Sequence, residues 1–312
     1  MSIPVIFDTD IGTDVDDIIA LALILTSPEL ELIGVTTVHA DVHLRATMVL
    51  KVLALRGITN VPVMAGTSDP LLRLVPRYWE GHEGQGLLEP GDAETYKAAH
   101  EHAVDYLVRT VMDNPGKIHL LAVGPMTNVA AALIREPRLA QNLAHVTIMG
   151  GVVRGHHALD LPFVEHNIRL DPEAAHILFT SGVPLTAVPL DVTTQVRITK
   201  DDVARIRREG GTAFHEAVAS QLEHYPRFAR TGWTFMHDPL AIAAAIRPEL
   251  VTCRSLHVHV ETEGRHTRGA TLAFEPTEWS RWPDNDPPGK ADFALEVDTP
   301  AFEAFLVDRL SS

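Results

Sequence analysis

Residues 7–21 read FDTDIGTDVDDIIAL, and this stretch decides the fold. The apolar residues 3–7, which lead into the acidic loop, predict a short buried strand. Residues 18–25, which follow the loop, are apolar on every side and predict a buried helix. Gly12 lets the backbone turn tightly between the two elements. A buried strand, an acidic turn and a buried helix are typical of the first unit of an α/β domain.

The same alternation of strand and helix continues along the chain. Four later apolar runs predict further buried strands: residues 30–38, 117–125, 145–151 and 183–191. This order predicts an α/β fold with an open, mostly parallel, doubly wound sheet of the Rossmann-like kind. Three alternating runs predict additional C-terminal strands near an edge: residues 256–261, 270–275 and 293–298. We find no linker and no internal repeat, so we expect a single domain over residues 1–312.

Five carboxylates crowd the loop of the opening motif: Asp8, Asp10, Asp14, Asp16 and Asp17. Like charges at this density repel one another, and a hard divalent cation with oxygen ligands relieves the repulsion. The loop contains no Cys or His, which favours calcium or magnesium over zinc. An alternative is that some of the aspartates cap the helix and the others lie in solvent. One or two acidic residues are enough for a helix end, however, and five are not needed there. The spacing also differs from that of an EF-hand loop.

The composition limits the class of partner. The chain has 312 residues with 41 acidic and 26 basic side chains, for a formal net charge of −15. This balance argues against a nucleic acid polymer, whose binding depends on clustered Lys and Arg. No apolar stretch is long enough to span a membrane, so we expect a cytoplasmic protein without a membrane partner. Cys253 is the only cysteine, which excludes an intramolecular disulfide, and we expect it to pack in the core.

Two irregular stretches are candidates for flaps over a site. Residues 72–96 are rich in Gly, Pro and charge, and residues 223–236 mix aromatic residues with arginines. Irregular segments of this kind often carry function. In doubly wound sheets the ligand binds beyond the carboxyl ends of the strands, and the acidic and polar motifs of this chain fall at those ends.

The strand, the DTDIGTDVDD loop and the helix together resemble the N-terminal signature of the inosine-uridine-preferring nucleoside hydrolase family, in the longer-looped version of some members. Five later blocks resemble the family's other motifs in the same order: GPMTN at 124–128, MGG at 149–151, EHNIRLDPEAA at 165–175, HDPLAIA at 237–243 and TRGAT at 267–271. The resemblance spans nearly the whole chain. It implies the nucleoside hydrolase fold and calcium-dependent hydrolysis of the N-glycosidic bond of ribonucleosides, which gives ribose and free nucleobase.

The resemblance also implies the metal ligands and two catalytic residues. The Ca2+ ligands, by motif position, are Asp10, Asp17, the main-chain carbonyl of Val123, and Asp238. Asp10 would in addition take the proton of a metal-activated water as that water attacks the anomeric carbon. His237 would protonate the departing base, since an imidazole titrates near neutrality. Without the resemblance, Val123 would simply end a buried strand and His237 would cap a helix.

Substrate-binding residues are implied in the same way. The ribose hydroxyls would be held in a reactive sugar pucker by Asp16, Glu165, Asn167 and Asp238. His82, in GHEGQGL, resembles a residue of the family's flap, and Tyr225 lies twelve residues before His237, where some members have a leaving-group tyrosine. The family also implies a homo-oligomer, either a dimer or a tetramer, and a role in nucleoside salvage.

Several positions depart from the family's pattern, and they concern the choice of substrate. Asp41 stands where the family often has an asparagine, and Gln85 replaces the usual aspartate of the flap. His156, His157 and Asp160 lie where the family has a shorter loop that contains an asparagine, so the residue that contacts the sugar's primary hydroxyl is not assigned. The preferred nucleobase is left open for the same reason.

Two other classes of protein compete with this interpretation. A haloacid-dehalogenase-type phosphatase also has two aspartates after a strand, but it needs Thr or Val where Gly12 stands, and we find no good match to its downstream motifs. A catalytically inactive calcium- or ribose-binding protein would keep the pocket and lose turnover. Loss of Asp10 or His237 would favour that second alternative, and both residues are present.

Overall fold

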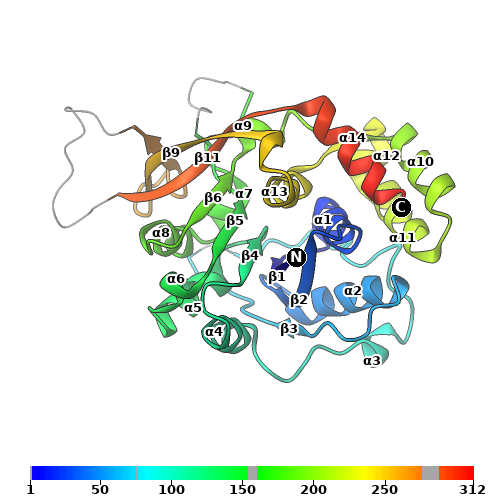
Figure 1. Cartoon of the computed structure of the whole chain (residues 1–312), viewed down its shortest axis with the longest axis horizontal. Coiled ribbons are helices and arrows are strands. Elements are labelled where there is room, and N and C mark those ends of the chain that lie inside the picture. The colour runs from blue at the N-terminus through cyan, green and yellow to red at the C-terminus, as the bar shows by residue number, and fades with distance from the viewer. Residues whose placement is uncertain (1, 75, 154–159, 276–287) are drawn as a thin grey trace.

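The computed structural model describes residues 2–74, 76–153, 160–275 and 288–312. Nine of the described strands form one sheet in the order β10-β9-β11-β6-β5-β4-β1-β2-β3 (Figure 1). Their bounds are β1 Ile3–Thr9, β2 Leu30–Thr37, β3 Val63–Ala65, β4 His119–Ala122, β5 His145–Met149, β6 Leu185–Val188, β9 Val251–Val260, β10 Thr271–Phe274 and β11 Gly289–Val297. Strands β7 (Arg197–Thr199) and β8 (Trp233–Phe235) pair antiparallel in a small second sheet.

The strand order identifies the edge at which a ligand can bind. The strands from β3 to β11 run parallel, and β9 is antiparallel to both β11 and β10. The chain extends the sheet from β1 through β2 to β3, then returns to β4 on the other side of β1. The order therefore reverses between β1 and β4, where doubly wound sheets place their ligands. The predicted α/β fold with additional C-terminal strands is confirmed.

Helices cover both faces of the sheet (Figure 1). Helices α1, α2, α13 and α14 lie on one face, and α4, α5 and α8 lie on the other. The helix bounds are α1 Asp16–Leu25, α2 Val42–Leu55, α3 Asp92–Thr95, α4 Ala103–Asp113, α5 Thr127–Arg135, α6 Leu139–Asn142, α7 His166–Leu170, α8 Pro172–Thr180, α9 Leu190–Thr193, α10 Lys200–Gly210, α11 Ala213–His224, α12 Pro226–Thr231, α13 His237–Ile246 and α14 Thr299–Leu310, with a 3-10 helix at Pro248–Leu250. None of the described helices is both long and apolar enough to cross a membrane.

The central strands are apolar throughout because both of their faces are buried. Val5 and Phe7 of β1 pack into one apolar cluster, and Ile6 between them packs into the other. In β4, Leu121 and Leu120 divide in the same way. Helix α1 packs against α13, which explains why its residues are buried on nearly every side.

Two expectations from the sequence are changed by the structure. Residues 223–236 are more regular than predicted, since Pro226 begins helix α12 and Gly232, at a left-handed φ of 79°, ends it before β8. The prediction for Cys253 is wrong, because its side chain is exposed on β9. Among the described residues, β10 pairs with residues 257–260 of β9, and the part of β9 that contains Cys253 pairs with β11 alone.

Candidate active site

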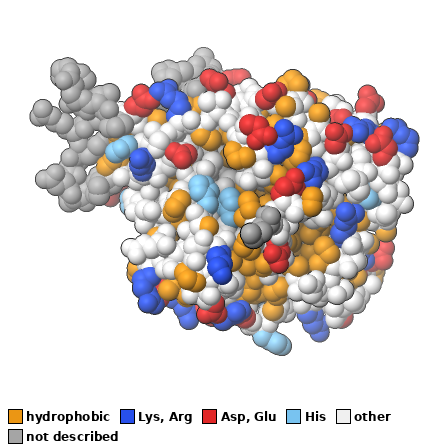
Figure 2. Space-filling model, viewed as in Figure 1, with side chains coloured by type: hydrophobic (Ala, Val, Ile, Leu, Met, Phe, Trp, Pro, Cys, Tyr) orange, Lys and Arg blue, Asp and Glu red, His pale blue; other side chains and the backbone are white. Residues whose placement is uncertain are grey.

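A pocket of about 530 Å³ lies beyond the carboxyl ends of the central strands. The ten residues predicted for the site all line it: Asp10, Asp16, Asp17, His82, Val123, Glu165, Asn167, Tyr225, His237 and Asp238. They come from segments far apart in the sequence: some follow the parallel strands, while Tyr225, His237 and Asp238 lie at the ends of helices α11 to α13. Acidic and basic side chains are interspersed on the face in Figure 2, so the described part of this face presents no continuous basic surface for a polyanion.

Two helix N-termini bring the pocket's carboxylates together. Asp16 and Asp17 begin α1, Asp238 lies in the first turn of α13, and these helices pack against each other. One carboxylate oxygen from each of the three residues lies within 4.8 Å of the others. The backbone N–H of Asp238 donates to Asp16 Oδ2 at 3.1 Å. The partial positive charge at each helix end favours this arrangement without neutralising it.

The electrostatics of this cluster favour a bound cation. Burial, together with repulsion from neighbouring aspartates, raises the pKa values of Asp16 and Asp238 well above the usual value of an aspartate. For Asp17, burial and the charge of Asp10 raise the pKa, while the Thr9 hydroxyl, which donates to Asp17 at 2.5 Å, partly opposes the rise. Buried carboxylates with raised pKa values and only oxygen donors are suited to a hard divalent ion. The described residues thus form an acidic site that can hold a metal.

Asp10 is held by a buried arginine that the sequence interpretation missed. Arg45 of α2 is fully buried. Its guanidinium donates to the main-chain carbonyls of Asp10, of Ile11 at 2.7 Å and of His39 at 2.8 Å, and to the Thr13 hydroxyl at 3.1 Å. Burial raises the pKa of the Asp10 carboxyl, and the charges of Arg45 and His39 oppose that rise. Arg45 therefore shapes the acidic loop and supplies positive charge beneath it.

The first aspartate of the loop has a structural position. Asp8 is fully buried and lies outside the pocket lining. Its Oδ1 accepts from the Thr36 hydroxyl at 2.5 Å and from Asn128 Nδ2 at 2.8 Å. Asn128 also donates to the carbonyl of Thr37, so it joins β1, β2 and the start of α5. Asp8 thus fixes the strands from which the acidic loop extends.

The EHN motif forms the opposite wall of the pocket. Glu165 caps α7 by accepting from the backbone N–H groups of Asn167 and Ile168, at 2.7 and 3.1 Å. Burial nevertheless raises the pKa of Glu165 to about 7. Asn167 Nδ2 donates to the carbonyl of Val123 at 2.6 Å, which places this carbonyl at the pocket beside the amide. The motif is therefore both a helix start and part of the pocket wall.

Three aromatic side chains lie near the pocket's other end. His237 Nδ1 lies 2.7 Å from the Thr193 hydroxyl, and burial lowers the pKa of its imidazole to about 4. Tyr225 donates its hydroxyl proton to Asp14 Oδ2 at 2.9 Å. The ring of His82 lies 6.4 Å from that of Tyr225, between centroids. Because these rings come from α13, the N-cap of α12 and residues 72–96, both predicted flap regions reach the pocket.

The described residues that depart from the family's pattern do not line this pocket. Asp41 caps α2 by accepting from the N–H of Leu44 at 3.0 Å. Gln85 lines a small neighbouring hollow, and Asp160 is exposed. His156 and His157 lie outside the described residues. The pocket lining also includes residues that were not predicted, namely Thr13, Asp14, Tyr78, Glu80, Met149, Pro162, Val164, His166, Arg169, Leu190, Pro226, Arg227 and Arg230.

Comparison with known proteins identifies the family. Residues 5–304 match the family model described as "Inosine-uridine preferring nucleoside hydrolase". The "Pyrimidine-specific ribonucleoside hydrolase RihA" of Citrobacter koseri is 34% identical over 320 residues, which cover 100% of this chain and 99% of that protein. A solved structure of a "Purine-Preferring Ribonucleoside Hydrolase from Gardnerella vaginalis" is 32% identical with a TM-score of 0.83, covering 99% and 98% of the two chains. A "Plant nucleoside hydrolase" is 28% identical with a TM-score of 0.85, and both chains are covered completely.

These matches extend over the whole pocket. The family model includes the acidic loop and every block that contributes a predicted residue. The relatives differ in the nucleobases that their names give, yet all are described as hydrolases of nucleosides. This chain belongs to the inosine-uridine preferring nucleoside hydrolase family and is a ribonucleoside hydrolase, an enzyme that cleaves the N-glycosidic bond between ribose and nucleobase.

Proposed function

We propose that this enzyme is calcium-dependent and that Asp10, Asp17, Asp238 and the main-chain carbonyl of Val123 hold the ion. The observation that carries the proposal is the cluster of Asp16, Asp17 and Asp238, whose buried carboxylate oxygens lie within 4.8 Å of one another. Two of the proposed ligands belong to this cluster, and Asp10 and Val123 line the same pocket. Carboxylates combined with a main-chain carbonyl are an ordinary ligand set for calcium. An ion held there would supply the Lewis acidity that makes a neighbouring water a better nucleophile at neutral pH.

Asp10 is the proposed general base. It takes one proton from the attacking water, while the water oxygen forms a bond to the anomeric carbon of the ribose. The bond between that carbon and the base nitrogen breaks, and its electron pair leaves with the base. Arg45 supports this role by holding the carbonyls of Asp10 and Ile11, which limits the freedom of the loop. A general base that is held in place is already positioned to take the proton, which lowers the entropic part of the barrier.

His237 is the proposed general acid. Its contact with Thr193 engages Nδ1, so Nε2 is the nitrogen that can give a proton to the departing base. Burial favours the neutral imidazole, so the acidic groups that line the pocket with it have to assist its protonation.

The ribose is proposed to lie between Asp16, Glu165, Asn167 and Asp238. The carboxylates accept hydrogen bonds from its hydroxyls, and the buried amide of Asn167 adds a polar contact. Such groups hold an oxocarbenium-like sugar in a distorted pucker. His82 and Tyr225 are proposed to face the nucleobase. The resemblance also supports homo-oligomers and a role in nucleoside salvage, and sedimentation analysis would test the first of these.

A nucleoside panel with and without chelator tests the proposal. Purified enzyme is given inosine, adenosine, guanosine, uridine and cytidine, and released base and ribose are measured. We expect release that stops after chelation and returns with added Ca2+ but not with buffer alone. Release that persists in the chelated enzyme would refute the calcium dependence. If metal-replete enzyme cleaves none of the five, the binding-protein alternative becomes the better explanation.

A further inference from the structure

The residues between the proposed base and the helix α1 carboxylates contact both flap regions. The carbonyl of Thr13 lies 2.9 Å from His82 Nε2, and its hydroxyl donates to Glu83 Oε1 at 3.3 Å. Next to it, Asp14 Oδ2 accepts the Tyr225 hydroxyl at 2.9 Å, while Asp14 Oδ1 accepts the N–H of Val15 at 2.6 Å. Two consecutive residues of the acidic loop therefore fasten two segments that are more than a hundred residues apart.

Glu83 orders the flap that Thr13 holds. Its side chain is buried, and it accepts from the backbone N–H groups of Glu80 at 2.8 Å and Gly81 at 2.7 Å. These contacts close a tight turn around the carboxylate. The turn places His82 at the pocket and against the Thr13 carbonyl.

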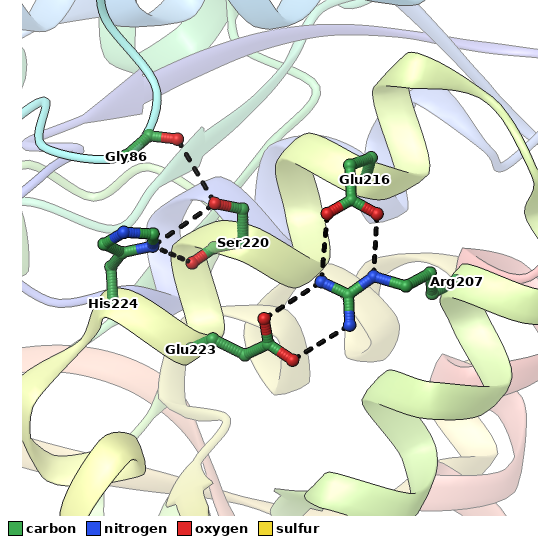
Figure 3. A network of polar contacts seen from close by, with 6 residues as sticks. All are labelled: Gly86, Arg207, Glu216, Ser220, Glu223 and His224. Carbon is green, nitrogen blue, oxygen red and sulfur yellow. Dashed lines mark hydrogen bonds and ion pairs between the residues drawn. The ribbon is translucent and has the colours of Figure 1, made fainter.

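Helix α11 holds the other end of the same flap. Gln221 Nε2 donates to the carbonyl of Gln85 at 2.7 Å. The neighbouring Ser220 hydroxyl donates to the carbonyl of Gly86 at 3.3 Å (Figure 3). His224, one turn later, contacts Ser220 through Nδ1. Tyr225 is the next residue and caps this helix.

Arg207 attaches α11 to α10. Its guanidinium binds the carboxylates of both Glu216 and Glu223 with two hydrogen bonds each, at 2.7 to 3.1 Å (Figure 3). Bidentate pairs of this kind fix orientation as well as distance. The acidic loop, the flap, α11 and Tyr225 thus form a closed ring of contacts, which we call the loop–flap ring, with a small hollow inside it.

We infer that Asp14 is a positioning residue for the nucleobase end of the pocket, and that it acts by holding the phenol of Tyr225. The inference rests on the proposed function. A hydrogen bond to a carboxylate is stronger than one between neutral groups, so this contact fixes the half-buried ring. Because the hydroxyl proton points to Asp14, the phenol oxygen offers the pocket a lone pair. Tyr225 therefore orients the base as an acceptor and does not protonate it.

A comparison of two kinds of substrate tests this inference. Inosine and uridine carry a nucleobase, whereas 4-nitrophenyl β-D-ribofuranoside carries the same sugar with a leaving group that needs no protonation. In Asp14→Asn, the amide oxygen still accepts from the N–H of Val15. The NH2 group faces the phenol and donates to its oxygen, so the direction of the hydrogen bond is reversed. We expect kcat/KM for the nucleosides to fall about 10-fold, mainly through KM, because a hydrogen bond to a charged group is lost. The aryl riboside should lose several-fold less.

A second variant makes the test independent of the folding of the first. Tyr225→Phe should show the same difference between substrates, and the double variant should be no worse than Tyr225→Phe alone, because the two residues act as one unit. Tyr106→Phe is the matched control, since its hydroxyl donates to the carbonyl of Ile33 at 2.7 Å, and it does not line the pocket. It should leave both activities unchanged.

Three outcomes would overturn the inference. Equal losses on nucleosides and aryl riboside in Asp14→Asn would place Asp14 with the ribose or the ion. Losses that multiply in the double variant would show that Asp14 and Tyr225 act separately. A wild-type enzyme that cleaves neither kind of substrate with metal present would refute the proposed function itself, and the inference with it.

Discussion

Titratable groups are buried in opposite ways at the two ends of the parallel strands, which we call the amino edge and the carboxyl edge of the sheet. At the amino ends of β4 and β5, His119 and His145 each lie 2.9 Å from a threonine hydroxyl of the next strand, and their rings lie 5.0 Å apart. At the carboxyl edge, buried carboxylates face one another. Burial favours the neutral form at both edges, since it lowers the pKa of His119 to about 3 and raises the pKa of Asp16 well above its usual value.

The difference between the edges distinguishes buried groups that serve the structure from buried groups that serve the function. The histidines keep neutral partners inside the protein, so the amino edge needs nothing further. The carboxylates repel one another, and within the acidic loop the guanidinium of Arg45 contacts two main-chain carbonyls and a hydroxyl. An acidic edge of this kind is complete only with a ligand or ion from outside. Buried charge without a partner is therefore the better indicator of the site than burial alone.

Asp10→Asn should give the largest effect and tests the functional side of this comparison. We expect kcat for nucleosides to fall by about 10³-fold, the usual order for loss of a general base. The melting temperature should stay the same or rise, because one of several like charges is removed. The measurement is steady-state release of base, combined with thermal unfolding of the same samples.

Asp8→Asn, two residues earlier and still within β1, is the matched control. Asp8 Oδ2 is buried and has no hydrogen-bond partner among the described residues, so the new amide group would bury an unsatisfied donor. This variant should lose stability while each folded molecule keeps its turnover. Undiminished turnover in Asp10→Asn, or a loss of turnover in Asp8→Asn without loss of stability, would contradict the division of roles along the loop.

Arg45→Met should give the next largest effect, on stability. The change leaves the carbonyls of Asp10, Ile11 and His39 without their donor, and we expect about 3 kcal/mol of lost unfolding free energy, as for breaking a buried charged network. Urea unfolding in chelator measures it. Arg45→Lys retains the charge without the planar fork and should recover only part of the loss. Wild-type stability in Arg45→Met would show that the acidic loop holds its shape without this cation.

The sequence was sufficient to predict the class of fold, and the ten site residues that the resemblance implied all line one pocket. Continuous apolar runs such as that of β1 require burial on both faces, and the parallel order then brings the loops after β1 and β4 together. Asp17 and the more distant Asp238 meet because α1, which follows β1, packs against α13. Their roles stay predictions, because lining a pocket does not by itself assign chemistry.

Features that depend on packing between elements could not be predicted. Arg45 lies on the buried face of α2 among Ala46, Val49 and Val52, and a lone arginine there was the available signal. What it binds depends on how α2 meets the acidic loop. Tyr225 was placed by resemblance, but its partner Asp14 is 211 positions away in the sequence, and no pattern connects the two.

The amino edge gives the smallest effect, and it is one of pH. The pKa of His119 is lowered from an ordinary value near 6.5 to about 3, so the unfolded chain binds a proton that the folded protein does not. The contribution of His119 to the free energy of unfolding is fully present above pH 6.5 and is lost as the pH drops towards 3. Between pH 7 and pH 5 we expect a loss of about 2 kcal/mol from this group. His119→Gln should flatten that part of the unfolding profile without changing nucleoside turnover at pH 7. An equally steep profile in the variant would mean that other groups cause the loss of stability in acid. His119 would then not be buried in the neutral form, and the contrast between the two edges would fail.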